Sequence, residues 1–367
     1  MQPGIYIHLP FCVVHCSYCD FPLSTRLSLS SLYYEALERE VQMRPPQQSN
    51  TLYFGGGTPS VTPAAIINKL IKMVPLTQDS EITLEANPDD VSAASLSSWL
   101  ECGITRLSIG VQSLEADVLA LMLRRHSPQQ AIIALQNAQQ SGFKNINVDL
   151  MLGSPCQTPE GFLLGLTQIL DFQPQHLSLY LLEVHEGTLL ARQIQEGKAQ
   201  QMPEDEQVSC YLQAVNSLKK AGYLHYEVSN FALPGFESRH NLKYWTSAPY
   251  YGYGVGACSY YEQRRIQNLR DIPAYVQAIT SGQLPIESDI TENRETEARN
   301  AVIFGLRKTD GIDVESFKIT YGIHPLSLFE NKADLFLAEG YLELHNGRLR
   351  LTSGGLLLSN EILSSAI

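Results

Sequence analysis

The stretch that decides the fold is IHLPFCVVHCSYCDFP, residues 7–22. Within it, eight positions hold three of the chain's seven cysteines: Cys12, Cys16 and Cys19. Cysteine thiolates are ligands of zinc and of iron–sulfur clusters. A structural zinc site usually pairs two short ligand clusters across a longer loop, and the sequence has no second cluster of this kind. A zinc site here would therefore need His8 or His15 as its fourth ligand.

The missing fourth cysteine is itself informative. A cubane cluster contains four irons and normally takes four thiolates, so three cysteines leave one iron without a protein ligand. An open coordination position is typical of a metal centre that binds an exchangeable ligand. The remaining cysteines are isolated in the sequence, and each is interpreted as a small buried apolar residue: Cys102, Cys156, Cys210 and Cys258.

Composition narrows the class of protein. The 367 residues are 44% hydrophobic and 17% charged, as in ordinary globular proteins, and the formal net charge is −12. This acidity argues against a nucleic-acid partner. No apolar run is long enough for stable membrane insertion, and the opening MQPGIYIHLP does not resemble a secretory signal. An odd number of cysteines, three of them in one loop, favours a reducing compartment, so we expect a cytoplasmic protein.

Apolar, β-branched runs recur through the first half of the chain. They lie at residues 4–9, 51–56, 81–87, 106–112, 145–153 and 176–183. Helical patterns separate most of them, for example at 62–74 and 127–143. Strands that alternate with helices predict parallel βαβ units. Six units are too few for an eight-stranded barrel, so the sequence predicts an α/β fold built on a partial (β/α)6 barrel.

Four polar residues interrupt these runs: Glu85, Gln112, Asp149 and Glu183. Three of them lie near the C-terminal end of a run, and Asp149 lies in the middle of one. The cysteine loop follows the first run, and GGGTPS, residues 55–60, follows the second. Because the C-terminal ends of parallel strands and their loops form the active face of a barrel, these residues predict a common site. Taken singly, each has the simpler interpretation of a helix cap or loop contact.

The remaining chain predicts two further parts. Residues 1–185 would form the barrel, 186–290 an α/β extension, and 291–367 a small domain. In that last part, helical patterns precede the turn HNGR between two apolar runs, which suggests a winged-helix-like domain. In so acidic a chain, a structural lid is favoured over a DNA-binding role for this domain.

Several motifs together carry a family resemblance. CVVHCSYC resembles the CxxxCxxC motif of the radical S-adenosylmethionine superfamily, and GGGTPS resembles its glycine-rich motif. IYIHLPFC, YFGGGTPS, EANPDD, RLSIGVQS and NVDLMLGSPCQT are together similar to the oxygen-independent coproporphyrinogen III oxidase family. This likeness extends from Tyr6 to the C-terminal domain.

The resemblance implies two resident groups and the residues that hold them. A [4Fe–4S] cluster would be bound by Cys12, Cys16 and Cys19. S-adenosylmethionine would be bound by Tyr6, Tyr18, Gly56, Gly57, Thr58, Glu85, Gln112, Arg124 and Asp149. Arg124 is assigned by its distance from Gln112 in the sequence, so the neighbouring Arg125 is an alternative.

Two departures within the family favour its haem-chaperone branch over its oxidases. Phe21 occupies the position where the oxidases have a further cysteine, and only eleven residues precede Cys12, whereas the oxidases have a longer N-terminal segment. In addition, HNLKYW, residues 240–245, resembles the HNxxYW signature that is linked to haem binding in this branch.

That signature implies a haem site formed by His240, Tyr244 and Trp245. A buried, hydrogen-bonded histidine is the alternative interpretation of His240. The related GAHS segment reads GACS here, with Cys258 in place of its histidine, which weakens the case for haem unless the thiolate substitutes.

The sequence therefore leads to one hypothesis and three alternatives. The hypothesis is a haem chaperone that binds a [4Fe–4S] cluster, S-adenosylmethionine and haem, depends on an electron donor, and transfers haem to an acceptor protein. Whether it also cleaves S-adenosylmethionine as an enzyme is left open. The alternatives are oxygen-independent oxidation of coproporphyrinogen III to protoporphyrinogen IX, radical modification of a nucleic acid, and a structural zinc protein.

Overall fold

Six parallel strands, paired in the order in which they occur in the chain, form the centre of the fold. The computed structural model describes residues 2–366, apart from the side chains of residues 330 and 331. The strands are β1 (Gly4–Leu9), β2 (Ser49–Gly56), β3 (Leu76–Ala86), β4 (Arg106–Gln112), β5 (Ile146–Leu152) and β6 (His176–Leu181). The predicted partial (β/α)6 barrel is confirmed.

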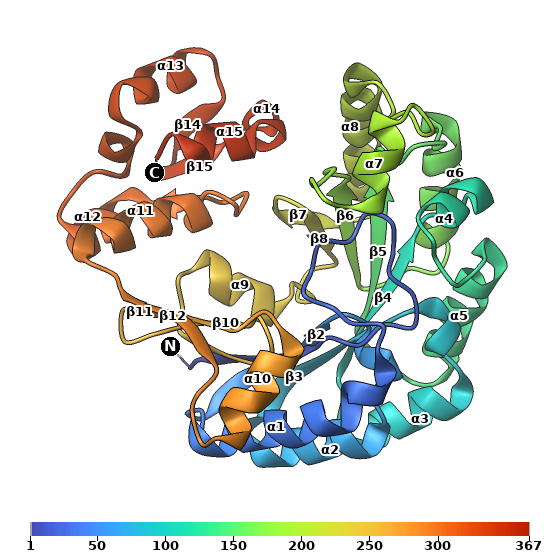
Figure 1. The fold of residues 1–367 in the computed structure, drawn as a ribbon. Helices are drawn as coiled ribbons and strands as arrows, with labels where there is room; N and C mark the ends of the chain where they lie inside the picture. The colour runs from blue at the N-terminus through green and yellow to red at the C-terminus, as the bar shows by residue number, and fades with distance from the viewer. Residues whose placement is uncertain (1, 367) are drawn as a thin grey trace.

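Helices that follow these strands cover the outer face of the sheet (Figure 1). They are α1 (Ser30–Met43), α2 (Ala64–Met73), α3 (Ala93–Glu101), α4 (Ala116–Leu121), α5 (Pro128–Gln140) and α6 (Pro159–Leu170). The start of α5 follows from its sequence, because Ser127 and Gln130 form a capping box around a proline at the first helical position. Just beyond its C-cap, Gly142 adopts a φ of 97°, a left-handed conformation that glycine tolerates best.

Alternation along the strands separates an apolar outer face from a polar inner face. On β4, Leu107, Ile109 and Val111 are fully buried in the core between sheet and helices. The intervening side of β4, from Arg106 to Gln112, faces a cavity inside the barrel. This period of two follows from the pleat of a strand, and it places the polar side chains of several strands around one interior space.

Residues 186–290 extend the same sheet at both of its edges. At the β6 edge lie β8 (Asn230–Ala232) and β7 (Leu224–Glu227), and at the β1 edge lie β9 (Tyr250–Tyr253), β10 (Cys258–Tyr261), β11 (Arg264–Asn268) and β12 (Ile286–Thr291). The helices of this part are α7 (Leu189–Gln195), α8 (Glu204–Lys220), α9 (Arg239–Trp245) and α10 (Ile272–Thr280). The predicted α/β extension therefore continues the barrel sheet instead of forming a sheet of its own.

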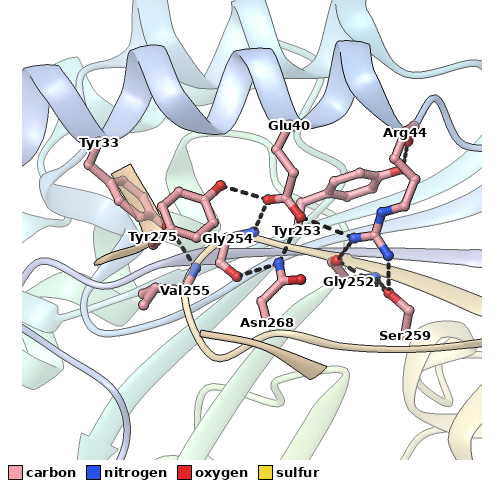
Figure 2. Close-up of polar contacts among 10 residues, drawn as sticks. All are labelled: Tyr33, Glu40, Arg44, Gly252, Tyr253, Gly254, Val255, Ser259, Asn268 and Tyr275. Atoms are coloured by element: carbon pink, nitrogen blue, oxygen red, sulfur yellow. Dashed lines mark hydrogen bonds and ion pairs between the residues drawn. The ribbon is translucent and has the colours of Figure 1, made fainter. Parts of the chain in front are cut away.

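A buried carboxylate joins this extension to α1 (Figure 2). Glu40 is fully buried, and its Oε1 accepts hydrogen bonds from Arg44 Nη2 at 3.1 Å and Asn268 Nδ2 at 2.7 Å. Its Oε2 accepts from the backbone N–H of Gly254 at 2.7 Å and from the Tyr275 hydroxyl at 2.6 Å. Four donors satisfy the buried charge, so this cluster connects α1 with β11, α10 and the turn after β9.

The C-terminal residues form a second, smaller core with its own antiparallel sheet. Its elements are α11 (Arg294–Gly305), β13 (Ile312–Asp313), α12 (Val314–Tyr321), α13 (Ala333–Ala338), β14 (Leu342–His345), β15 (Arg348–Leu351), α14 (Ser353–Leu357) and α15 (Ser359–Ser364). The predicted hairpin at HNGR is confirmed, with Asn346 and Gly347 both at positive φ in the turn. Within residues 2–366, no helix has both the length and the apolar character that crossing a membrane requires.

Candidate functional site

A cavity of about 730 Å³ fills the interior of the barrel. Its upper end, at the C-terminal ends of the strands, is bounded by the cysteine loop and the glycine run that follows β2. Inward-facing side chains of β2 to β6 form its walls, and residues 356–361 of the C-terminal domain lie against one side. The volume falls within the range of small-molecule sites in proteins.

All three cysteines of the loop line this cavity. The loop is held in place by backbone bonds from Ser17 to the end of α4 and from Cys12 to Ser24. The Thr58 hydroxyl donates to Cys12 Sγ at 3.2 Å. Burial raises the pKa of Cys19 to about 11 and also raises the pKa of Cys12. These thiols therefore remain protonated in the free protein, and a bound cationic cluster would supply the charge that favours the thiolates.

Both histidines that might complete a zinc site have other partners. The Nε2 atom of His8 lies 2.7 Å from the carbonyl oxygen of Pro22, and its Nδ1 atom lies 3.1 Å from the Tyr6 hydroxyl. The Nε2 atom of His15 lies 3.0 Å from the carbonyl oxygen of Cys19. Neither of these histidines lines the cavity, whereas all three cysteines do, and three cysteine ligands would suit an iron–sulfur cluster.

The glycine run lies directly against the cysteine loop. Backbone N–H groups of Gly57 and Thr58 donate to the carbonyls of Leu9 and Phe11 at 2.9 and 3.0 Å. A Cβ atom on Gly57 would lie 2.6 Å from the carbonyl of Pro10 and 3.0 Å from Cys12 Sγ. Only glycine permits this approach, so the run forms a cradle beside the cysteines in which backbone groups face the cavity.

Two adjacent arginines after α4 have different partners. Arg124 donates from Nη2 to the carbonyl oxygen of Gly110 at 2.7 Å, and its Nη1 lies 3.5 Å from Cys16 Sγ. The Nε of Arg124 is buried without a partner. Arg125 instead forms ion pairs with two carboxylates that follow β3, Asp89 and Asp90. Arg124 is therefore the arginine that contacts the cysteine loop.

Two buried carboxylates face the cavity from β3 and β5. Glu85 accepts from the Tyr53 hydroxyl at 2.8 Å and from the backbone N–H of Gly56 at 3.3 Å. Asp149 accepts from Asn147 Nδ2 at 2.7 Å and from the Ser108 hydroxyl at 3.1 Å. Burial raises the pKa of both groups, and that of Glu85 rises to about 7, with the nearby Asp149 charge as a further cause. They can accept hydrogen bonds from the amine and hydroxyl groups of a ligand.

Gln112 ends β4 in a strained backbone conformation, with a φ of 65°. Its Oε1 is buried without a hydrogen-bond partner. Strain and an unpaired polar atom in one cavity-lining residue are typical of ligand sites, because a ligand can satisfy the group. Tyr18 also lines the cavity. Tyr6 instead lies behind the glycine run, where a Cβ on Gly55 would be 2.9 Å from its ring.

The residues of the HNLKYW segment lie on α9, beneath the barrel. His240 is 1% exposed, and its ring nitrogens lie 3.0 Å from Thr51 Oγ1 and 2.8 Å from the Tyr244 hydroxyl. Burial lowers the pKa of His240 to about 3. Glu81 accepts hydrogen bonds from the first backbone N–H groups of α9, which fixes the helix across the lower end of the barrel.

The predicted haem residues therefore do not converge on the large cavity. Tyr244 and Trp245 line a separate cavity of about 200 Å³. The arrangement of His240 matches the alternative of a buried, hydrogen-bonded histidine. Cys258 begins β10 in an exposed position. Of the HNLKYW segment, the residue that lines the large cavity is Asn241.

Sequence reasoning did not identify several residues that line the cavity: Arg106, Ser108, Asn147, Ser178, Tyr180 and Arg307. The alternation of RLSIGVQ offered a signal for Arg106, because it has the same parity as Gln112 on β4. Glu183, which we expected at the end of a strand, follows β6, lines the cavity and accepts from Asn360 of the C-terminal domain at 2.9 Å. Phe21 also lines the cavity and is 65% exposed.

Comparisons with known proteins agree with this architecture. Residues 6–163 match the radical SAM superfamily, and residues 293–358 match the HemN C-terminal domain. A Bacillus subtilis protein named heme chaperone HemW is 32% identical over 98% of each chain. A mouse mitochondrial protein, radical S-adenosyl methionine domain-containing protein 1, is 38% identical over 70% of this chain and 60% of its own.

A solved structure shows the same fold. The coproporphyrinogen III oxidase HemN from Escherichia coli, described as a radical SAM enzyme, superposes with a TM-score of 0.86 over 100% of this chain and 90% of its own, at 24% identity. At that identity, the likeness establishes the fold alone. The superfamily match and the relatives that align over the full length place the sequence more narrowly: the chain belongs to the HemW family of the radical S-adenosylmethionine superfamily.

Proposed function

We propose that this protein is a haem chaperone that binds a [4Fe–4S] cluster, S-adenosylmethionine and haem, and transfers haem to acceptor proteins. One observation carries the proposal. Three cysteines and a glycine cradle face one cavity of about 730 Å³, in a chain whose full length is similar to proteins named heme chaperone HemW.

Cys12, Cys16 and Cys19 would hold the cluster, whose chemistry when bound is one-electron reduction of S-adenosylmethionine. The backbone at Gly56 and Gly57 lets the methionine end of S-adenosylmethionine approach closely, since neither residue has a side chain there.

The polar groups around this cradle would orient the rest of the molecule. The Arg124 guanidinium suits its carboxylate, whereas the unpaired Gln112 Oε1 and the Glu85 carboxyl, which accept hydrogen bonds, suit its amino group. Asp149 suits the ribose hydroxyls. Tyr18 would close one side of this site, and Tyr6 would support the glycine run from behind.

Haem is the proposed cargo, and the interior cavity offers apolar wall area for it. Tyr180, Leu181 and Leu358 line the cavity, and each remains at least 36% exposed. Flat aromatic and branched aliphatic side chains of this kind favour a planar apolar ring. Coordination of haem iron by His240 would require one of its two hydrogen bonds, with Thr51 or with Tyr244, to break. We therefore propose cavity binding of haem as the first step and treat ligation by His240 as a separate test.

Phe21 favours a chaperone over an oxidase. It lines the cavity with a side chain that neither donates a proton nor ligates iron, at the position where the oxidases have a further cysteine. We propose a cytoplasmic protein that receives electrons from a separate donor. The acceptor of the haem would be a protein that takes up haem.

Anaerobic reconstitution with iron and sulfide tests the proposal directly. Wild-type protein should acquire a brown chromophore, bind S-adenosylmethionine and change the absorbance of added haem. Serine substitutions at Cys12, Cys16 and Cys19 should abolish the chromophore. Cys102→Ser is the matched control, because Cys102 lies on the outer side at the end of α3, where its thiol faces the carbonyl of Ala64.

Two outcomes would overturn the proposal, and a third would decide the role of His240. Bound zinc without a chromophore would indicate a structural zinc protein. Consumption of coproporphyrinogen III by the reconstituted protein would indicate an oxidase. Haem binding unchanged in His240→Ala would restrict His240 to a structural role while leaving the chaperone proposal intact.

A further inference from the structure

Arg106 is a buried arginine whose side chain makes no hydrogen bond within the described residues. Arg106 is 2% exposed, and its side chain is the largest of the fully buried side chains in the described residues. Among the residues that the structure describes, its guanidinium makes no hydrogen bond and no ion pair within 4 Å, and its Nε is buried and unpaired. A buried charge is costly unless a counter-charge and hydrogen bonds compensate it, so an unpaired guanidinium in a cavity indicates a missing ligand.

The guanidinium faces the large cavity at its lower end. Arg106 begins β4, whereas Gln112 ends it, and both line the cavity. They are six positions apart, which corresponds to about 20 Å along a strand. Asn241 of α9 lines the cavity as well, so the cavity extends from the cysteine loop down to the helix that lies across the bottom of the barrel.

A second unpaired group lies at the same level. Thr83 is the partner of Arg106 in the register between β3 and β4, and its hydroxyl is buried without a hydrogen bond. Glu85 and Asp149 interact electrostatically with Arg106, but the oxygens of both carboxylates accept hydrogen bonds from other donors. Arg106 thus provides unused donors for an anion at the floor of the cavity, and the Thr83 hydroxyl is a further unused donor at the paired position of the neighbouring strand.

The chemistry of a guanidinium selects the ligand group. Its planar fork of N–H donors matches a carboxylate with two parallel hydrogen bonds. Within the proposed function, on which this inference rests, two ligands carry carboxylates: S-adenosylmethionine through its methionine end and haem through its propionates. The upper end of the cavity already supplies the Arg124 guanidinium for a carboxylate beside the glycine cradle.

We propose that Arg106 forms a carboxylate-binding subsite at the floor of the barrel, which holds a propionate of the bound haem. Haem would then lie below S-adenosylmethionine, with its acidic edge directed to Arg106. The subsite distinguishes acidic porphyrins from neutral ones, since a neutral ester would leave the buried guanidinium unpaired.

The test compares wild-type protein with Arg106→Gln and Arg106→Lys in three titrations on the reconstituted protein. Haemin and haemin dimethyl ester are followed by absorbance, and S-adenosylmethionine by calorimetry. Wild type should prefer haemin to the ester by about ten- to a hundredfold, the range expected for a charge-assisted hydrogen bond. R106Q should lose this preference, R106K should keep part of it, and both should bind S-adenosylmethionine as wild type does.

Two controls exclude a general effect of charge and a loss of folding. Arg39→Gln removes the same charge from an exposed position on α1 and should leave the haemin preference unchanged. Melting of ligand-free R106Q should occur near the wild-type temperature, because the substitution breaks no hydrogen bond of the guanidinium and Glu85 and Asp149 keep their own donors. If R106Q melts well below wild type, R106K alone decides the test.

Each other outcome overturns a specific statement. Equal haemin affinity in wild type and R106Q overturns the subsite while leaving the chaperone function intact. Weakened S-adenosylmethionine binding with unchanged haemin binding overturns the assignment to haem and gives the subsite to S-adenosylmethionine. Wild-type protein that binds neither haemin nor its ester overturns the proposed function together with this inference.

Discussion

Replacing Glu40 with alanine should destabilise the contact between α1 and the extension of the sheet more than any change on the exposed face of α1. The substitution removes the acceptor of four hydrogen bonds: those from Arg44, Asn268, Gly254 and Tyr275. The side chain of Arg44 is only 10% exposed, so its charge cannot recover full hydration.

The magnitude follows from the groups left behind. Breaking a buried ion pair by removing one partner costs about 3–5 kcal/mol, because the other charge is left buried and uncompensated. Arg44 retains bonds to the carbonyl of Gly252 and to Ser259, which offsets part of this cost. We therefore expect Glu40→Ala to lower the free energy of unfolding by about 3 kcal/mol. Glu40→Gln should cost less, since it keeps one acceptor and the shape of the side chain.

Urea denaturation and hydrogen exchange would measure this effect. Amides of β9 to β11 and of α10 should exchange faster in Glu40→Ala, because these elements lose their attachment to α1. Amides of β13 to β15 should exchange as in wild type, since they belong to a separate core. Glu35→Ala, at an exposed position on the same helix, is the matched control and should change stability by less than about 0.5 kcal/mol.

Two results would refute the reasoning. A Glu40→Ala variant as stable as Glu35→Ala would mean that the buried cluster contributes no net stability. Faster exchange spread evenly over the barrel and the C-terminal domain would mean that Glu40 does not act through the extension.

Three further predictions concern the site and its surroundings. Gly57→Ala should lower the iron content after reconstitution because its Cβ would collide with the cysteine loop, whereas Gly354→Ala, whose Cβ has no neighbour closer than 3.8 Å, should retain wild-type iron. Arg124→Ala should weaken S-adenosylmethionine binding by about tenfold or more in calorimetry, and Arg125→Ala should change it by less than about twofold. Burial raises the pKa of Glu227 from 4.5 to about 7, so the stability that its protonated form retains at low pH is lost as the pH rises through 7. Glu227→Gln should therefore gain stability relative to wild type between pH 5 and 8, by about 3 kcal/mol at most, in denaturation curves at both pH values.

Local patterns in the sequence were sufficient for the barrel and for the upper part of the site. The apolar runs and their spacing predict β1 to β6, because consecutive parallel strands pair with their neighbours in the chain. The cysteine loop and the glycine run could be assigned to one face for the same reason. Because β1 and β2 are parallel neighbours, the loops that follow them lie side by side, which brings Gly57 close to Cys12.

Contacts between distant segments could not be predicted in this way. β9 pairs with β1 across more than two hundred residues, so the extension looked separate although it continues the same sheet. The hydrogen bond between His240 and Thr51 spans a similar separation, and no periodicity in either segment encodes it. The burial of Arg106 could not be predicted for a different reason. A charged residue at the first position of a strand is usually a solvated residue at the boundary of the sheet.

The position of α9 has a kinetic consequence. Because Glu81 fixes this helix across the lower end of the barrel, we expect a ligand at the floor to enter and leave past the cysteine loop and the residues proposed to bind S-adenosylmethionine. Haem would then have to bind before S-adenosylmethionine and could leave only after S-adenosylmethionine had dissociated. Our hypothesis is that bound S-adenosylmethionine slows the dissociation of haem and must itself dissociate before haem is transferred to an acceptor protein. Slower haem release in its presence would support this order, and equal release rates would refute it.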